Sequence, residues 1–103
     1  MKRKIAVVGG GASGLMAAIS AARSGAQVTI YERMDRVGKK ILATGNGRCN
    51  LTNRYAQIPN YHGKNPRFLH SAISRFWVQE TLDFFLELGI VAKEEEQGKI
   101  YPY

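Results

Sequence analysis

Three glycines near the start of the chain have the spacing of a phosphate-binding turn. Gly9, Gly11 and Gly14 match the pattern G-x-G-x-x-G within the stretch VVGGGASG. In this pattern the first glycine permits a tight turn, the second lets the backbone approach a pyrophosphate, and the third lets a helix pack close to the strands. Ala12 and Ser13 would open that helix, whose free N–H groups and positive dipole end suit a diphosphate. The stretch therefore predicts a dinucleotide site.

A carboxylate follows at a place from which it can reach a ribose. Glu32 ends the segment AQVTIYE, 18 residues after Gly14, and can accept hydrogen bonds from the adenosine ribose hydroxyls. The alternative is a glycine-rich turn without a ligand, but strand, helix and acid together favour dinucleotide binding. FAD and NAD share this fingerprint. Glu32 argues against a 2′-phosphate, Arg33 beside it leaves NADP open, and the early position in the chain suits FAD.

A third group of candidate residues lies in the stretch GKKILATGNGRCNLTN, residues 38–53, which has three Gly, three Asn, two Thr and the only Cys. Lys40 and Arg48 can face a diphosphate, flavin oxygens or an anionic substrate. Thr44 and Asn46 can satisfy irregular backbone and bond the polar atoms of a cofactor. The alternative is an Ω-loop bonded only to itself. Cofactor contact is the favoured interpretation, because an irregular backbone is seldom buried unless it has a functional role.

The elements that position these groups form a strand–helix–strand unit. Residues 4–8 (KIAVV) read as a buried strand, residues 12–23 as a helix with one apolar face, and residues 26–32 as a second strand. Such a unit has parallel strands and a right-handed crossover. The predicted fold class is α/β, with residues 1–54 as the N-terminal part of a Rossmann domain that begins a doubly wound parallel sheet.

The second part, residues 55–103, reads as two helices and a β-hairpin. The first helix starts at Asn65-Pro66, and the second spans about Val78 to Leu88. Residues 90–93 and 99–101 would form the hairpin. The expected inward residues are Phe68, Leu69, Ala72, Ile73 and Phe76 of the first helix, and Val78, Leu82, Phe85 and Leu86 of the second. Because these elements do not complete a doubly wound sheet, we expect a truncated chain, the head of a longer protein.

Composition excludes several classes of protein. The net charge is +7, and residues 1–54 alone carry ten Lys/Arg and two acids, yet no nucleic-acid motif accompanies this charge. One Cys excludes an intrachain disulfide and fits a cytoplasmic location. His62 and His70 lack a partner at ligand spacing, so no metal is expected. Glycines interrupt the apolar run after MKRK, which argues against a signal peptide, and no span is long enough to cross a membrane.

The stretch ERMDRVGKKILATGNGRCNLTN, residues 32–53, resembles one flavoprotein family. This is the aminoacetone oxidase/BaiN-like group of FAD-binding, NAD(P)/FAD-dependent oxidoreductases. A GGGxxGL fingerprint, a Glu-Arg strand end, FFLELGI and GKIYP are also similar to that family, so the resemblance covers essentially all of the chain.

The resemblance implies an FAD-dependent oxidoreductase acting on a small molecule, with NAD(P)H as a candidate electron donor and no nucleic-acid or membrane partner. Members are several times longer, which implies an N-terminal fragment. The resemblance assigns no catalytic acid or base to this chain.

Two other functions stay open. One is an NAD(P)-binding oxidoreductase without flavin, and the other is an inactive truncated product that acts at most as a binding or interaction module. Cys49 is interpreted as a packed apolar residue, since flavin disulfide chemistry needs a cysteine pair. Trp77, Phe84 and Phe85 are interpreted as core rather than as a flavin-stacking platform.

Overall fold

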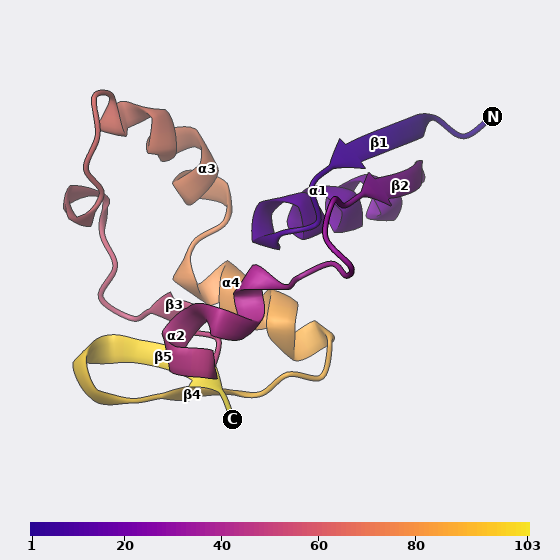
Figure 1. Cartoon of the computed structure of the whole chain (residues 1–103). Helices are drawn as coiled ribbons and strands as arrows, with labels where there is room; N and C mark the ends of the chain where they lie inside the picture. Colours follow the sequence, from indigo (N-terminus) through magenta and orange to yellow (C-terminus); the bar gives the residue numbers. More distant parts are fainter. The chain divides into compact units, whose positions relative to one another are not determined.

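The computed structural model describes residues 1–103, which fold as two compact units, Met1–Gly47 and Arg48–Tyr103. Figure 1 follows the chain from the strand–helix–strand of the first unit to the small antiparallel sheet of the second. Each unit is described by itself below. The domain boundary expected at residues 54/55 stays a prediction. The units divide earlier, because residues 52–53 pair with a strand near the C-terminus.

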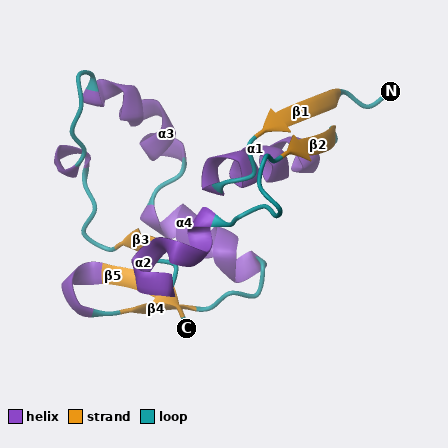
Figure 2. Cartoon of the chain, viewed as in Figure 1, coloured by secondary structure: helices purple, strands orange, loops and turns teal.

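The first unit begins with β1 (Lys4–Val8), α1 (Ala12–Arg23) and β2 (Gln27–Tyr31). The strands pair in parallel, from Lys4 opposite Gln27 to Val8 opposite Tyr31, and the helix lies along them (Figure 2). The predicted α/β class and Rossmann-type start are confirmed. The first strand and the helix have the predicted bounds, and β2 is one residue shorter at each end.

Side-chain alternation in β2 explains which face of the sheet packs against the helix. Val28 and Ile30 are partly buried, whereas Gln27, Thr29 and Tyr31 are exposed. Since successive side chains of a strand point to opposite faces, one face packs on α1. The helix ends where Gly25 takes a φ of +93°, with its N–H donating to the carbonyl of Ala22, which is a common glycine-dependent helix end.

The first unit ends in a 3₁₀ helix, Lys40–Ala43, followed by the short α2 (Thr44–Gly47). The helical turn predicted around Ile41 is confirmed. Gly45 and Asn46 have positive φ inside α2, so this segment is not a regular right-handed helix.

The second unit holds a three-stranded antiparallel sheet in the order β3 (Thr52–Asn53), β5 (Lys99–Pro102), β4 (Ala92–Glu94). The predicted hairpin is confirmed as β4 and β5. Strand β3 was not predicted, because two polar residues inside a loop show no strand period. Ile100 in the central strand is 1% exposed, the most deeply buried side chain of the chain.

The two predicted helices of this unit are present, but their bounds differ from the predicted ones. A 3₁₀ turn, Pro66–Leu69, precedes α3 (His70–Arg75), and α4 spans Val78–Glu87. A further 3₁₀ turn, Ile58–Asn60, lies before them. At the start of α4 the Glu80 carboxylate accepts the backbone N–H of the N-cap residue Trp77 at 2.8 Å, which is one half of a capping box.

The predicted inward faces are wrong at four positions. Phe68 is 82% exposed, Phe76 41% and Leu86 60%, and Ala72 is exposed too, whereas Phe84 is 7% exposed. The first helix begins with a 3₁₀ segment of four residues, which has three residues per turn, so a 3.6-residue period misplaces its face. In α4, Phe84 packs edge-on against Phe76 and Phe85. The interpretation of the aromatic group as core holds for Phe84, and Trp77 and Phe85 are partly buried.

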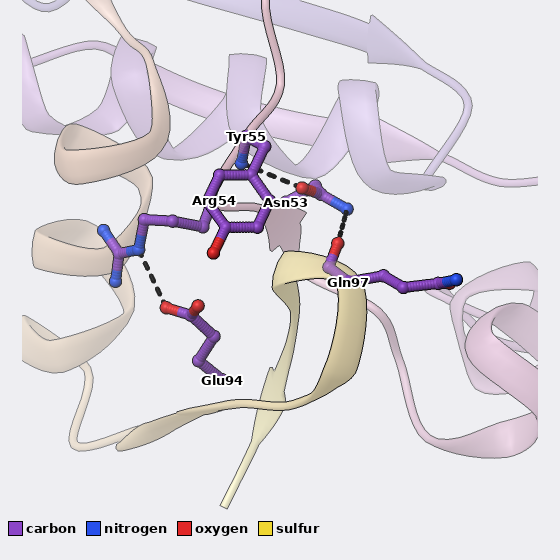
Figure 3. A network of polar contacts seen from close by, with 5 residues as sticks. All are labelled: Asn53, Arg54, Tyr55, Glu94 and Gln97. Carbon is purple, nitrogen blue, oxygen red and sulfur yellow. Dashed lines mark hydrogen bonds and ion pairs between the residues drawn. The ribbon is translucent and has the colours of Figure 1, made fainter.

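A polar network joins β3 to the turn between β4 and β5 (Figure 3). Asn53 donates through Nδ2 to the carbonyl of Gln97 at 3.1 Å and accepts the N–H of Tyr55 at 2.9 Å. Arg54 pairs with Glu94 at 2.9 Å. The turn, Glu96–Gly98, has positive φ at Gln97 and Gly98. Side-chain bonds therefore hold this strained turn against the short strand.

None of the helices has the length and apolar character needed to cross a membrane.

Candidate functional site

The three fingerprint glycines occupy the turn between β1 and α1. Gly9 has a φ of +97° and donates its N–H to the carbonyl of Tyr31 at 2.8 Å, which ties the turn to the end of β2. Gly11 is the N-cap residue of α1, and Gly14 lies in its first turn. A Cβ on Gly14 would fall on the carbonyl oxygen of Gly9. The helix can therefore approach the strand only because residue 14 has no side chain.

The turn leaves room for a ligand at the helix N-terminus. Ideal Cβ atoms on Gly9 and Gly11 would meet no protein atom within 4 Å. Gly11, Ala12 and Ser13 are exposed, and no side chain caps the helix. The first N–H groups of a helix lack intrahelical acceptors and carry partial positive charge. These residues fit a diphosphate of a dinucleotide, with the two open glycines at the place of closest approach.

Glu32 follows β2 directly and is fixed by backbone amides. One carboxylate oxygen accepts the N–H of Gly10 at 2.7 Å, and the other accepts the N–H of Met34 at 2.8 Å. The amides of Met34 and Gly10 lower the pKa of Glu32 below its ordinary value, because they stabilise the charged form. An ionised carboxylate has about four acceptor positions, so capacity remains for the hydroxyls of a ribose.

The lowered pKa of Glu32 predicts a pH dependence of stability. The unfolded chain takes up the proton first as the pH falls, since the folded-state pKa lies below the ordinary value of 4.5. The stabilising contribution is therefore complete above that value and is lost as the pH falls through the folded-state pKa. Urea unfolding of Glu32→Gln should show a smaller loss of stability on acidification than the wild type.

Glu96→Gln, which changes an exposed glutamate of the hairpin turn, is the matched control and should keep the wild-type slope. A Glu32→Gln protein with the same slope as this control would show that the two amide bonds do not hold the carboxylate in solution.

The remaining candidates of the first unit follow Glu32 along the chain. Arg33 and Lys40 are exposed, and Lys40 opens the 3₁₀ helix. The hydroxyl of Thr44 donates to the carbonyl of Ile41 at 2.7 Å, so its hydrogen is already used, although its oxygen can still accept. Asn46 is exposed with a φ of 55°. Their roles at a cofactor stay predictions.

Arg48 belongs to the second unit and has its own partners there. It forms an ion pair with Glu95, and its guanidinium lies 4.1 Å from the centre of the Tyr101 ring. The bond to Glu95 raises the pKa of Arg48, and the same bond lowers that of Glu95. The guanidinium is half-exposed, so one edge can still reach an anion, and its predicted contact with the cofactor stays a prediction.

Asn50 shows the self-bonded alternative for the loop. Its side-chain amide donates to the carbonyls of Ile100 at 3.0 Å and of Thr52 at 3.2 Å. Asn53 bonds the hairpin turn, as described above. Cys49, between Arg48 and Asn50, is partly buried with a φ of 58°. For these asparagines the structure assigns the side chains to the backbone of the second unit.

Sequence reasoning missed Gly10, which lies between two fingerprint glycines, and its two neighbours in space. The N–H of Gly38 bonds the Gly10 carbonyl, and Val37 lies where a Cβ of residue 10 would be. The available signal was Gly10, the middle glycine of the run GGG, which the G-x-G-x-x-G pattern does not require.

Comparison with known proteins gives a family match over nearly the whole chain. The profile described as "HI0933-like protein Rossmann domain" matches residues 3–103. The chain is 52% identical over 101 residues to the 3-dehydro-bile acid delta(4,6)-reductase of Clostridium scindens, covering 96% of this chain and 24% of that protein.

More distant relatives have other activities. A ribosomal RNA dihydrouridine synthase of Haemophilus influenzae is 35% identical over 95 residues, which cover 92% of this chain and 24% of that protein. An NADH oxidase of Thermoanaerobacter brockii is 46% identical over 41 residues, covering 40% of this chain and 6% of that protein. The chain thus spans about a quarter of the length of the first two relatives.

Proposed function

Because the chain belongs to the HI0933-like Rossmann domain family, we propose that its first unit binds the ADP half of FAD, and that the protein acts as a flavin-dependent oxidoreductase. The kinship with the aminoacetone oxidase/BaiN-like flavoproteins, inferred above from motifs, is confirmed.

One observation carries the cofactor proposal. The carboxylate of Glu32 bonds the backbone of the glycine turn at Gly10, so the ribose acceptor and the diphosphate turn form one structure beside the open helix end. Such an arrangement matches a ligand with a ribose next to a diphosphate.

Each residue has a defined part in this proposal. The amides of Gly11, Ala12 and Ser13 bind the diphosphate, and Gly9 and Gly14 let the turn and the helix take their positions. Glu32 accepts from the ribose hydroxyls, while Arg33, Lys40, Thr44 and Asn46 of the first unit are assigned to the rest of the cofactor. The predicted cofactor contact of Arg48, in the second unit, stays a separate prediction. Bound FAD supplies the hydride or electron transfer at its isoalloxazine ring. No acid or base of this chain is assigned.

The names of two relatives narrow the reaction class. A delta(4,6)-reductase and a dihydrouridine synthase both add hydrogen across a carbon–carbon double bond. We extend this to the present protein as reduction of a carbon–carbon double bond, with NAD(P)H as the electron donor. The higher identity to the bile acid enzyme supports a small-molecule substrate over RNA. A nicotinamide-only oxidoreductase is the rival, and it would bind NAD(P) in this turn without binding FAD.

Ligand titrations test the cofactor proposal. FAD should bind saturably, and ADP should displace it, because both carry the adenosine diphosphate. FMN, which lacks that half, should bind at least about tenfold more weakly than FAD. Equal affinity for FMN and FAD, or binding of NADP alone, would contradict the proposal.

The Gly11→Ala variant should lose at least about tenfold in FAD affinity, since a methyl group would occupy the space left for the diphosphate. No protein atom lies within 4 Å of that position, so the melting temperature without ligand should change little. Gly63→Ala, where a Cβ is also unopposed, is the matched control for both measurements. Unchanged affinity in Gly11→Ala would mean that the diphosphate does not approach this residue.

A further inference from the structure

We infer that Gly38 is a positioning residue for the dinucleotide turn, which it holds through its hydrogen bond to Gly10, and that Val37 restricts residue 10 to glycine. This inference rests on the proposed function, since the turn is taken to bind FAD. Gly10 lies between two fingerprint glycines and is not itself part of the fingerprint.

Both polar backbone groups of Gly10 bond the segment that follows β2. Its N–H donates to the carboxylate of Glu32 at 2.7 Å. Its carbonyl accepts the N–H of Gly38 at 2.7 Å. Gly10 is buried, unlike Gly11 beside it. The peptide groups on either side of Gly10 are therefore fixed by residues outside the turn and its helix.

Val37 fills the space where a side chain of residue 10 would lie. An ideal Cβ on Gly10 would be 2.6 Å from Cγ1 and 3.0 Å from Cβ of Val37. Valine is branched at Cβ and has little rotational freedom. The Val37 side chain could move away only together with its backbone, and that movement would break the hydrogen bond from the Gly38 N–H to the Gly10 carbonyl. Gly38 already has a φ of +69°. A side chain on residue 10 would therefore clash with Val37, which is itself 47% exposed, unless the 37–38 segment moved.

The run of three glycines thus divides into two roles. Gly9 and Gly11 border space that contains no protein atom within 4 Å, whereas Gly10 is closed by Val37. The Gly10 carbonyl and the Gly11 N–H belong to one planar peptide group, so fixing the carbonyl also fixes the direction of that N–H. Groups held in their bound geometry before binding lose less entropy when the ligand arrives. The bond from Gly38 acts in this way on the turn.

A double-mutant cycle tests the inference. FAD affinity is measured for the wild type, Gly10→Ala, Val37→Ala and the double variant, with Gly63→Ala as the matched control. We expect Gly10→Ala to lose at least about tenfold in affinity, because overpacking displaces the 37–38 segment. Val37→Ala should lose less than about threefold, and the double variant should return to within about threefold of wild type, since the 2.6 Å contact is gone.

Amide hydrogen exchange at Gly38 gives a second readout that needs no ligand. Exchange should be slow in the wild type, fast in Gly10→Ala and slow again in the double variant. If Gly10→Ala does not fold, recovery of folding in the double variant supports the inference, and failure to recover overturns it.

The outcomes separate the two proposals. A wild type that binds no FAD overturns the proposed function. The contact of residues 37 and 38 with Gly10 is then tested by the exchange data alone. A wild type that binds FAD while Gly10→Ala binds equally well, or while Val37→Ala brings no recovery, overturns the inference and leaves the proposed function standing.

Discussion

Replacing Gly14 with alanine should lower the free energy of unfolding by about 3 kcal/mol, the upper end of the range for overpacked sites. The new Cβ would fall on the carbonyl oxygen of Gly9. That atom belongs to the backbone of the turn and cannot rotate away, so α1 would have to move off the sheet. In an exposed helix the same change is favourable by about 1 kcal/mol, so the sign here reports the close approach of helix and strand.

Urea unfolding followed by circular dichroism measures the effect. Gly63→Ala makes the same chemical change at a position where no atom lies within 4 Å and φ is not positive, and it should stay within about 0.5 kcal/mol of wild type. Equal stability of the Gly14 and Gly63 variants would show that α1 does not approach β1 as described.

Gly98→Ala should also destabilise the protein by about 3 kcal/mol, from two sources of comparable size. Gly98 has a φ of +75°, which strains any side chain. Its Cβ would lie 2.6 Å from Cδ2 of Tyr55 and 2.8 Å from Oδ1 of Asn53. Asn53 cannot move aside freely, because it bonds both Gln97 and Tyr55. The hairpin turn would therefore separate from β3.

Gly89→Ala separates the two sources. Gly89 has a φ of +85° but no atom within 4 Å of a Cβ, so its replacement should cost only the backbone strain, about 1 kcal/mol. The difference between the two variants measures the contact with Tyr55 and Asn53. If both lose the same amount, the turn does not pack against β3 in solution.

Local patterns were sufficient to predict the first unit. The strand–helix–strand arrangement depends on short-range signals: a β-branched run, an Ala-rich helix with one apolar face, and Gly25 at its end. The fingerprint and Glu32 follow the same order in the sequence as in the structure. These features need no knowledge of distant contacts, which explains why residues 4–31 were predicted almost to the residue.

The features that were missed depend on contacts between residues far apart in the sequence. Strand β3 exists because Thr52 and Asn53 meet β5, almost fifty residues away. Arg48 reaches Glu95 across 47 positions, a partner that its place in the loop did not suggest. The exposure of Phe68 follows from the 3₁₀ turn at the start of its helix. The spacing of apolar residues along a single sequence does not predict such contacts.

Chemical-shift mapping of the ¹⁵N-labelled chain with FAD tests the central claim most directly. The claim is that the turn between β1 and α1, together with Glu32, forms the binding site for the adenosine diphosphate half. It predicts that the largest shifts fall on the amides of Gly11, Ala12, Ser13 and Met34, and that ADP reproduces them. Shifts confined to other residues, or no shifts at saturating FAD, would contradict it.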